Sequence, residues 1–166
     1  CDAIVYAFKV SDHSMGARFK MYDDRNFCNG HRTVTVGMPV GYLVSGPYER
    51  EHNLQTVIEA RSETGGNYLA YVATDESETD MEVDKLAKSL TFILETKHTA
   101  PRNFWGVEGM KIFRDLIYQM RGMMRADHKF YKKHTERLEA IVSRASYYKR
   151  PVKLVIIFFY ICSGSK

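Results

Sequence analysis

The sequence predicts an α+β fold, with an antiparallel sheet of roughly five strands and helices packed on it. Short runs rich in β-branched and aromatic residues fill the first half of the chain, and glycine, proline and polar clusters separate them. Apolar residues at helical spacing dominate the second half, and strands followed by helices are typical of this class. With 166 residues, 45% of them hydrophobic, the chain is long enough for a domain with its own core.

Three strands are expected in the first part of the chain. Ala3 to Val10 is rich in β-branched and aromatic residues and predicts a buried first strand. Ala17 to Tyr22 is a candidate second strand, and a turn cluster that ends at Gly30 follows it. His31 to Val36 alternates polar and apolar residues, as a half-buried strand does. These runs together predict an antiparallel meander.

A loop and then a hairpin are expected next. Gly37 to His52 holds three glycines and two prolines, which predicts a loop rather than a helix. Leu54 to Arg61 and Asn67 to Thr74 flank the sequence Ser-Glu-Thr-Gly-Gly, whose two glycines can adopt positive φ. We therefore expect these two runs to pair as antiparallel strands.

A helix is expected from Thr79 to about Lys97. Thr79 and Glu82 have the spacing of a capping box, and apolar residues follow at helical intervals as far as Leu94. Residues 1–100 therefore form the predicted α+β domain, and a helical region, 107–149, follows it. The alternative is one compact domain over residues 1–166.

The helical region carries an apolar seam at coiled-coil spacing. Its members, three and four residues apart, are Met110, Phe113, Ile117, Met120, Met124, Tyr131, Leu138, Ile141, Ala145 and Tyr148. A 3.5-residue period of this length predicts one exposed helix that pairs with partner helices, and His134, in the middle of the seam, can specify their register. Two buried helices with a break near Arg125 to Lys129 would produce a similar pattern. Gly122, which costs about 1 kcal/mol in a helix interior, favours the break.

Charge is unevenly distributed along the chain. The net charge is +4, but Lys111 to Arg150 alone holds eleven Lys or Arg residues and four acids. This surplus predicts an anionic partner, either a membrane surface or nucleic acid. A solvated helix face that keeps the protein soluble explains the same surplus.

Other sequence features limit the possible functions. Cys1, Cys28 and Cys162 are too few and too far apart for a disulfide framework or a zinc knuckle, so a reducing, cytoplasmic location is expected. No metal site or cofactor is predicted, because the histidines lack ligand spacing and no glycine-rich phosphate loop precedes a helix. The apolar tail, 151–162, is about half as long as a membrane-spanning helix. It predicts either a core strand or the remnant of an anchor.

Three stretches of the chain resemble longin-type R-SNAREs. Val57 to Glu76, followed by Asp84 to Leu94, resembles the longin segment in which two strands that end in a Thr-Asp pair lead into an amphipathic helix. Gln119 to Ala145 resembles the central R-SNARE motif, with His134 standing where the family has its central Arg. Pro151 to Cys162 lies where the membrane anchor of the family begins.

This resemblance implies a longin-like domain and a non-catalytic function in membrane trafficking. The seam residues would pair with helices of partner proteins in a parallel bundle, and burial of apolar surface would drive the pairing. Basic residues near the tail would contact anionic lipid headgroups at about 1 kcal/mol each. These residues are Arg144, Lys149, Arg150 and Lys153. The implied location is cytoplasmic and membrane-associated.

Two other functions fit parts of the sequence. Cys1 could be the nucleophile of an N-terminal hydrolase, with its own α-amine as the base and with Arg18 and Asp24 as orienting residues. Choloylglycine-type hydrolases are similar at their mature N-terminus. The basic helical region could instead bind nucleic acid, with tyrosines that stack on bases, although the sequence has no recognisable nucleic-acid-binding motif.

Overall fold

The computed structural model describes residues 1–26, 28, 31–32, 35, 37–65, 67–98, 103–133 and 154–158. One sheet contains the strands β1 (Ala3–Ser11), β2 (Ser14–Met15), β3 (Pro39–Ser45), β4 (Tyr68–Thr74) and β5 (Leu154–Phe158). The helices are α1 (Ala17–Asn26), α2 (His52–Thr64), α3 (Thr79–Thr96) and α4 (Phe104–Gln119). A further helical segment covers residues 125–133.

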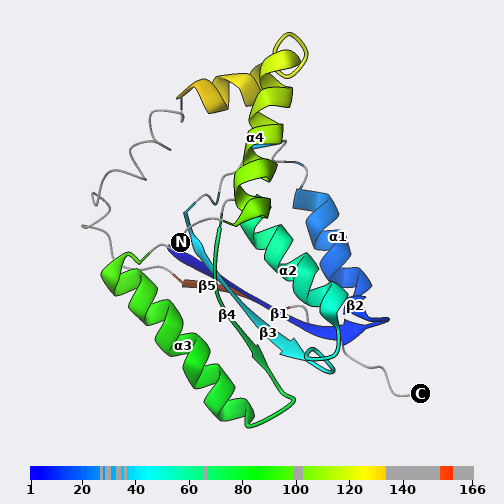
Figure 1. Cartoon of the computed structure of the whole chain (residues 1–166), viewed down its shortest axis with the longest axis vertical. Coiled ribbons are helices and arrows are strands. Elements are labelled where there is room, and N and C mark those ends of the chain that lie inside the picture. Colours follow the sequence, from blue (N-terminus) through cyan, green and yellow to red (C-terminus); the bar gives the residue numbers. More distant parts are fainter. Residues whose placement is uncertain are drawn as a thin grey trace.

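The sheet is built around β1. β3 pairs with β1 in parallel, with Ile4 opposite Val40, and β4 pairs with β3 in parallel. β5 pairs in parallel with Ala3–Ala7, while β2 forms a short antiparallel ladder with the end of β1. Parallel neighbours cannot be joined by a tight turn, so the chain crosses a face of the sheet between them. α1 and α2 make the first two of these crossings (Figure 1).

Alternate strand residues form an apolar core on each face of the sheet. On one face, β1 and β3 pack against α1 and α2, and the buried residues are Ile4, Tyr6, Phe8, Phe19, Val40, Tyr42, Val44, Leu54 and Ile58. On the other face, Leu86 and Leu90 of α3 pack with Ala3, Val5 and Ala73. The sheet therefore lies between helices, with α4 against α2 as an outer element (Figure 1).

The coarse prediction of a sheet with helices packed on it is confirmed. β1 confirms the strand predicted at Ala3 to Val10, and α3 confirms the helix predicted at Thr79 to Lys97. The antiparallel arrangement is wrong, since β1, β3, β4 and β5 all pair in parallel. The reason is that segments expected to be strands or turns are helices, which return the chain to the start of the sheet.

α1 replaces the strand predicted at Ala17 to Tyr22. Its aromatic residues do not alternate between two faces of a sheet but pack together against β1. The ring centroids of Phe19 and Tyr22 lie 5.5 and 5.9 Å from that of Tyr6. A short run rich in aromatic residues is compatible with either structure, and the long-range packing decides between them.

α2 replaces the first strand of the predicted hairpin. Leu54, Ile58 and Ser62 are buried at intervals of four residues, which is the spacing of one helix face. The expected hairpin turn is instead the end of this helix, because the Gly65 amide donates to the Arg61 carbonyl. The strand predicted at Asn67 to Thr74 is confirmed as β4, but its neighbour is β3.

β3 lies within Gly37 to His52, where a loop is predicted, so that prediction is also wrong. Pro39 is the first residue of the strand, a position that proline tolerates. A Cβ atom on Gly41 would lie 2.5 Å from Cδ1 of Leu86, so this glycine allows α3 to approach the sheet closely. Of the strand predicted at His31 to Val36, only residues 31, 32 and 35 are described, and none of these is in a strand.

The long helical region is interrupted within the described part of the chain. α4 ends at Gln119, and the amides of Met123 and Met124 both donate to the Met120 carbonyl at 2.9 Å, which forms a turn around Gly122. One continuous helix is therefore wrong, and the break precedes the range Arg125 to Lys129. Residues 134–153 lie outside the described residues, as does the predicted tail apart from β5. None of the described helices has the length and apolar content to cross a membrane.

Candidate functional site

The ends of three strands meet at one edge of the sheet. β1, β3 and β4 run in parallel and end at Ser11, Ser45 and Thr74. Each is followed by a short connection and then by the start of a helix: residues 12–16 lead to α1, 46–51 to α2 and 75–78 to α3. We call these connections the hairpin loop, the β3–α2 loop and the β4–α3 loop, and together they form the carboxyl edge (Figure 1).

The hairpin loop contains a tight turn between β1 and β2. Asp12 and His13 have φ angles of 49° and 60°, in the left-handed region. Asp and His adopt this region more readily than β-branched residues, and two such residues in succession match the twist of a two-residue hairpin. The carbonyl of Gly16 then accepts the first bonds of α1, from Phe19 and Lys20. The turn therefore places the start of α1 beside the end of β1.

Two carboxylates fasten the β3–α2 loop to the β4–α3 loop. Asp75 accepts bonds from the Ser45 hydroxyl at 2.6 Å and the Gly46 amide at 2.8 Å. Glu76 accepts from the amides of Tyr48 and Glu49 at 2.9 and 2.7 Å. Gly46 has a φ of 106°, which only glycine adopts without strain. These four bonds give the β3–α2 loop a defined conformation.

The pKa of Asp75 reflects this arrangement. Burial opposes ionisation of the carboxyl group, but the bonds from Ser45 and Gly46 favour the charged form more strongly. The net effect lowers the pKa of Asp75 below its ordinary value. The carboxylate therefore stays charged at neutral pH and keeps both bonds.

An ion pair joins the hairpin loop to the β3–α2 loop. Nδ1 of His13 lies 2.7 Å from Oε1 of Glu51, the residue that precedes α2. The hydrogen bond and the charge of Glu51 raise the pKa of His13 above 6.5, and the charge of Asp12 acts in the same direction. The two loops are therefore joined most firmly when His13 is protonated.

Replacement of Glu51 by Gln is expected to lower the pKa of His13 towards its ordinary value of 6.5. Because the pKa is raised in the folded protein, the contact contributes fully at pH below 6.5 and is lost as the pH rises through the raised value. NMR titration of the His13 ring measures this shift. Glu49→Gln, in the same loop, is the matched control, and an unchanged midpoint in Glu51→Gln would contradict the assignment.

The helices that start at the carboxyl edge favour negative charge there. No side chain caps the start of α2, and neither α1 nor α2 has an acidic residue in its first turn. The first amides of a helix lack partners within the helix, and its dipole adds partial positive charge at this end. An anion placed between the starts of α1 and α2 would therefore be stabilised.

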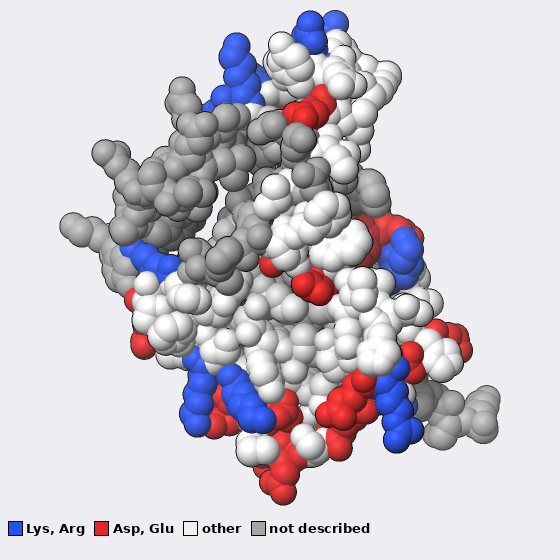
Figure 2. Space-filling model, viewed as in Figure 1, with Lys and Arg blue, Asp and Glu red and all other residues white. Residues whose placement is uncertain are grey.

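Side-chain charge divides the carboxyl edge into two halves. The α3 half holds Asp75, Glu76, Glu78 and Asp80, and residues 75–84 include no base. The half formed by the hairpin loop and the β3–α2 loop is nearly balanced, with Arg18, His13 and Arg50 against Asp12, Glu49 and Glu51. Figure 2 shows acidic side chains gathered towards the lower end of the molecule, with Lys and Arg side chains among them. An anionic ligand would therefore bind in the balanced half.

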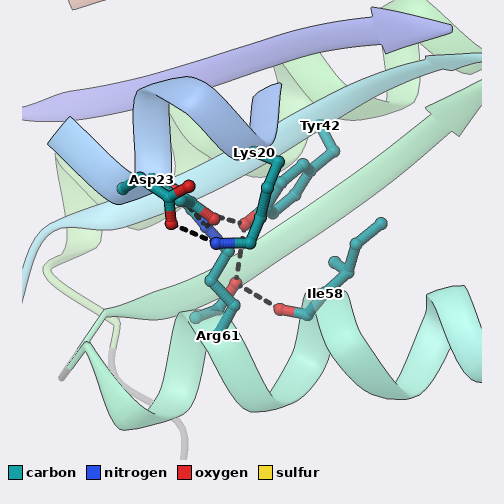
Figure 3. Close-up of polar contacts among 7 residues, drawn as sticks. Lys20, Asp23, Tyr42, Ile58 and Arg61 are labelled. Carbon is teal, nitrogen blue, oxygen red and sulfur yellow. Dashed lines mark hydrogen bonds and ion pairs between the residues drawn. The ribbon is translucent and has the colours of Figure 1, made fainter. Parts of the chain in front are cut away.

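A partly buried cluster around Arg61 holds α1 and α2 in position (Figure 3). Nε of Arg61 donates to both Asp23 oxygens, at 3.1 and 3.0 Å, and Nη2 donates to Oδ1 at 2.7 Å. Nη1 donates to the Tyr42 hydroxyl at 2.9 Å. One guanidinium group thus connects α1, α2 and β3.

Aromatic rings enclose the same guanidinium group. Its central carbon lies 4.4 Å from the ring centroid of Tyr6 and 4.9 Å from that of Phe19. Burial alone lowers the pKa of Arg61, but the bonds to Asp23 and the charges of nearby groups outweigh it and raise the pKa. Arg61 is therefore permanently charged, and its function is to fix the two helices whose starts form the balanced half of the carboxyl edge.

The proposed hydrolase residues lie on α1 and at the chain start before β1. Cys1 is exposed just before β1, with its Sγ 3.6 Å from Sδ of Met38. Arg18 and Asp24 are both exposed on α1, and Asp24 pairs with Lys20. Cys1 precedes β1, so it lies at the edge of the sheet opposite the carboxyl edge. Its role as a nucleophile stays a prediction.

The apolar seam is only partly described. Ile117 is 1% exposed, and buried Tyr131 donates from its hydroxyl to the His31 carbonyl at 2.7 Å, so the chain itself covers both. Met120 and Met124 are half-buried beside the turn. The other members lie outside the described side chains: Met110, Phe113, His134, Leu138, Ile141, Ala145 and Tyr148. Pairing with partner helices stays a prediction, as does lipid contact by Arg144, Lys149, Arg150 and Lys153.

Sequence reasoning missed the carboxyl edge, although its signals are present. Polar or glycine residues follow each buried strand directly: Asp12 and His13 after β1, Gly46 after β3, and Asp75 and Glu76 after β4. In an antiparallel order these positions would alternate between opposite edges of the sheet. The parallel order brings them together.

The chain matches no protein-family model and no curated protein sequence. Among the described residues, no group of three or more His, Cys, Asp or Glu side chains could hold a metal ion.

Proposed function

We propose that the chain binds a small organic ligand with a phosphate group, in the balanced half of the carboxyl edge. The observation that supports this is the convergence of parallel strand ends and the starts of α1 and α2 at one edge. In open sheets with parallel strands, ligands bind outside the carboxyl ends of the strands. The loops there can vary without disturbing the sheet.

A phosphate group fits the electrostatics of this half. The start of α2 has neither a side-chain cap nor an acid in its first turn, so its first amides can donate to an anion. The amides of Gly46, Tyr48 and Glu49 already donate to Asp75 and Glu76. The phosphate would therefore bind at the first turn of α2, beside the His13–Glu51 pair, rather than over the β4–α3 loop.

The organic part of the ligand can contact the side chain of Tyr48. Tyr48 lies in the β3–α2 loop, half-buried against the core, and burial raises the pKa of its hydroxyl. The Gln55 side chain donates to the carbonyls of Tyr48 and Glu49 at 3.0 and 3.1 Å and fixes this part of the loop. Small-molecule sites are usually largely pre-formed and lined by apolar and aromatic side chains, so a fixed loop that carries Tyr48 supports this proposal.

Replacement of Asn53 by Asp is expected to weaken binding of phosphate-bearing ligands about fivefold, since a negative charge in the first turn of α2 repels an anion there. The same charge favours the helix dipole, so the variant should unfold at the same temperature as the parent protein or slightly above it. Titration calorimetry with nucleoside monophosphates and sugar phosphates, each compared with its unphosphorylated form, measures the effect.

Gln119→Glu is the matched control, because it makes the same change from amide to carboxylate at the end of α4, away from the carboxyl edge. It should leave ligand affinity unchanged. The proposal fails if no phosphate-bearing compound binds more tightly than its unphosphorylated form. It also fails if Asn53→Asp binds such a compound as tightly as the parent protein does.

A further inference from the structure

The end of α4 forms a projecting surface with an apolar centre and basic surroundings. Residues 118–133 comprise the last turn of α4, the turn at Gly122 and the helical segment 125–133, and we call them the basic tip. Met123 is 74% exposed and Tyr118 is 62% exposed. α4 ends at the top of Figure 1, and Figure 2 shows Lys and Arg side chains at the same end of the molecule.

The charge of the basic tip is one-sided. Five exposed bases lie on it: Arg121, Arg125, Lys129, Lys132 and Lys133. Its only acid in the sequence is Asp127, which lies 3.3 Å from Nδ1 of His31 and 3.5 Å from Nε of Arg32. These contacts neutralise the acid within the chain. The bases therefore determine the charge that a partner meets.

The conformation of the basic tip is fixed by contacts along its length. Arg121 donates to the Tyr118 carbonyl at 3.1 Å, and Arg125 donates to the Gly122 carbonyl at 3.2 Å. Tyr131 is buried, and its hydroxyl bonds to the His31 carbonyl. Met123 is thus held at an exposed position between bases, in a turn whose ends are both anchored.

We infer that the basic tip docks on an anionic lipid surface. An apolar side chain surrounded by Lys and Arg can enter the headgroup region while the bases contact negatively charged lipids. Nucleic acid fits less well, because the Arg121 guanidinium lies 5.0 Å from the centroid of the Tyr118 ring and occupies one of the two ring faces on which a base could stack. This inference is independent of the ligand proposed at the carboxyl edge.

Sedimentation of the full chain with vesicles tests the inference. The protein should bind vesicles of phosphatidylserine and phosphatidylcholine, should not bind pure phosphatidylcholine, and should bind less as salt increases. Met123→Ser is expected to weaken binding roughly tenfold, because it removes the apolar centre. Met81→Ser, at an exposed methionine of α3, is the matched control and should bind like the parent protein.

A second variant tests the same surface by gain of function. A Cβ atom on Gly122 meets nothing within 4 Å, so there is open space for the start of a side chain, and Gly122→Leu adds apolar surface beside Met123. It should strengthen binding several-fold. The inference is overturned if anionic vesicles do not bind, if Met123→Ser binds as well as the parent protein, or if single-stranded RNA binds while vesicles do not.

Discussion

Replacement of Asp23 by Ala is expected to destabilise the fold by about 2 to 3 kcal/mol. The change leaves the partly buried Arg61 guanidinium without its carboxylate, and the uncompensated charge accounts for most of the loss. Asp23 is 31% exposed, so the loss should be smaller than the roughly 3 to 5 kcal/mol expected for a fully buried ion pair. Urea denaturation followed by circular dichroism measures the change in the free energy of unfolding.

The adjacent residue provides the matched control. Asp24 is 58% exposed on the same helix and pairs with Lys20, so Asp24→Ala should cost less than about 0.5 kcal/mol. The loss of stability in Asp23→Asn should lie between those of Asp23→Ala and Asp24→Ala, because an amide oxygen can still accept a bond from Arg61. Equal losses in Asp23→Ala and Asp24→Ala would show that the Arg61 cluster does not fasten α1 to α2.

Replacement of Ile58 by Ala is expected to cost about 2 to 5 kcal/mol. Ile58 is 0% exposed at the centre of the core between α2 and the sheet, so truncation removes apolar contacts and leaves a cavity. The loss should appear as a lower urea midpoint with little change in the slope of the transition.

Val57 is the control for this substitution. It is 45% exposed on the neighbouring position of α2, so Val57→Ala should change stability by no more than about 0.5 kcal/mol. The two adjacent substitutions should differ in their loss of stability because α2 turns Ile58 towards the core and Val57 towards solvent. If Val57→Ala were as costly as Ile58→Ala, the burial of α2 against the sheet would be wrong.

Local patterns were sufficient to predict β1 and α3. β1 is an unbroken run of β-branched and aromatic residues, and α3 combines a capping-box sequence with apolar residues at helical intervals. In each case local propensity and burial agree. Although Thr79 and Glu82 mark the start of α3 correctly, no side-chain bond caps it, and Glu82 binds Tyr71 and Lys85 instead.

The errors arose where the decisive contacts are distant in sequence. Leu54 to Arg61 is short and its apolar pattern is ambiguous, and the helix is stabilised by packing on β1 and β3. Arg61 finds Asp23 across 38 residues of chain, a pairing that neither local sequence contains. The carboxyl edge was not predicted for the same reason: strand ends converge at one edge only in a parallel sheet, and an antiparallel sheet was expected.

The parallel order of the strands also has a kinetic consequence. In the native register Ile4 meets Val40 and Pro39 meets Tyr68, so neither pairing can begin as a local hairpin. The chain loses the entropy of closing these long loops before the strand contacts can stabilise the sheet. This slows folding and leaves strand edges exposed in the meantime. Early helix formation in α1 and α2 would shorten the distance between strand ends during this search. The crossover helices thus assist assembly of the sheet as well as covering it.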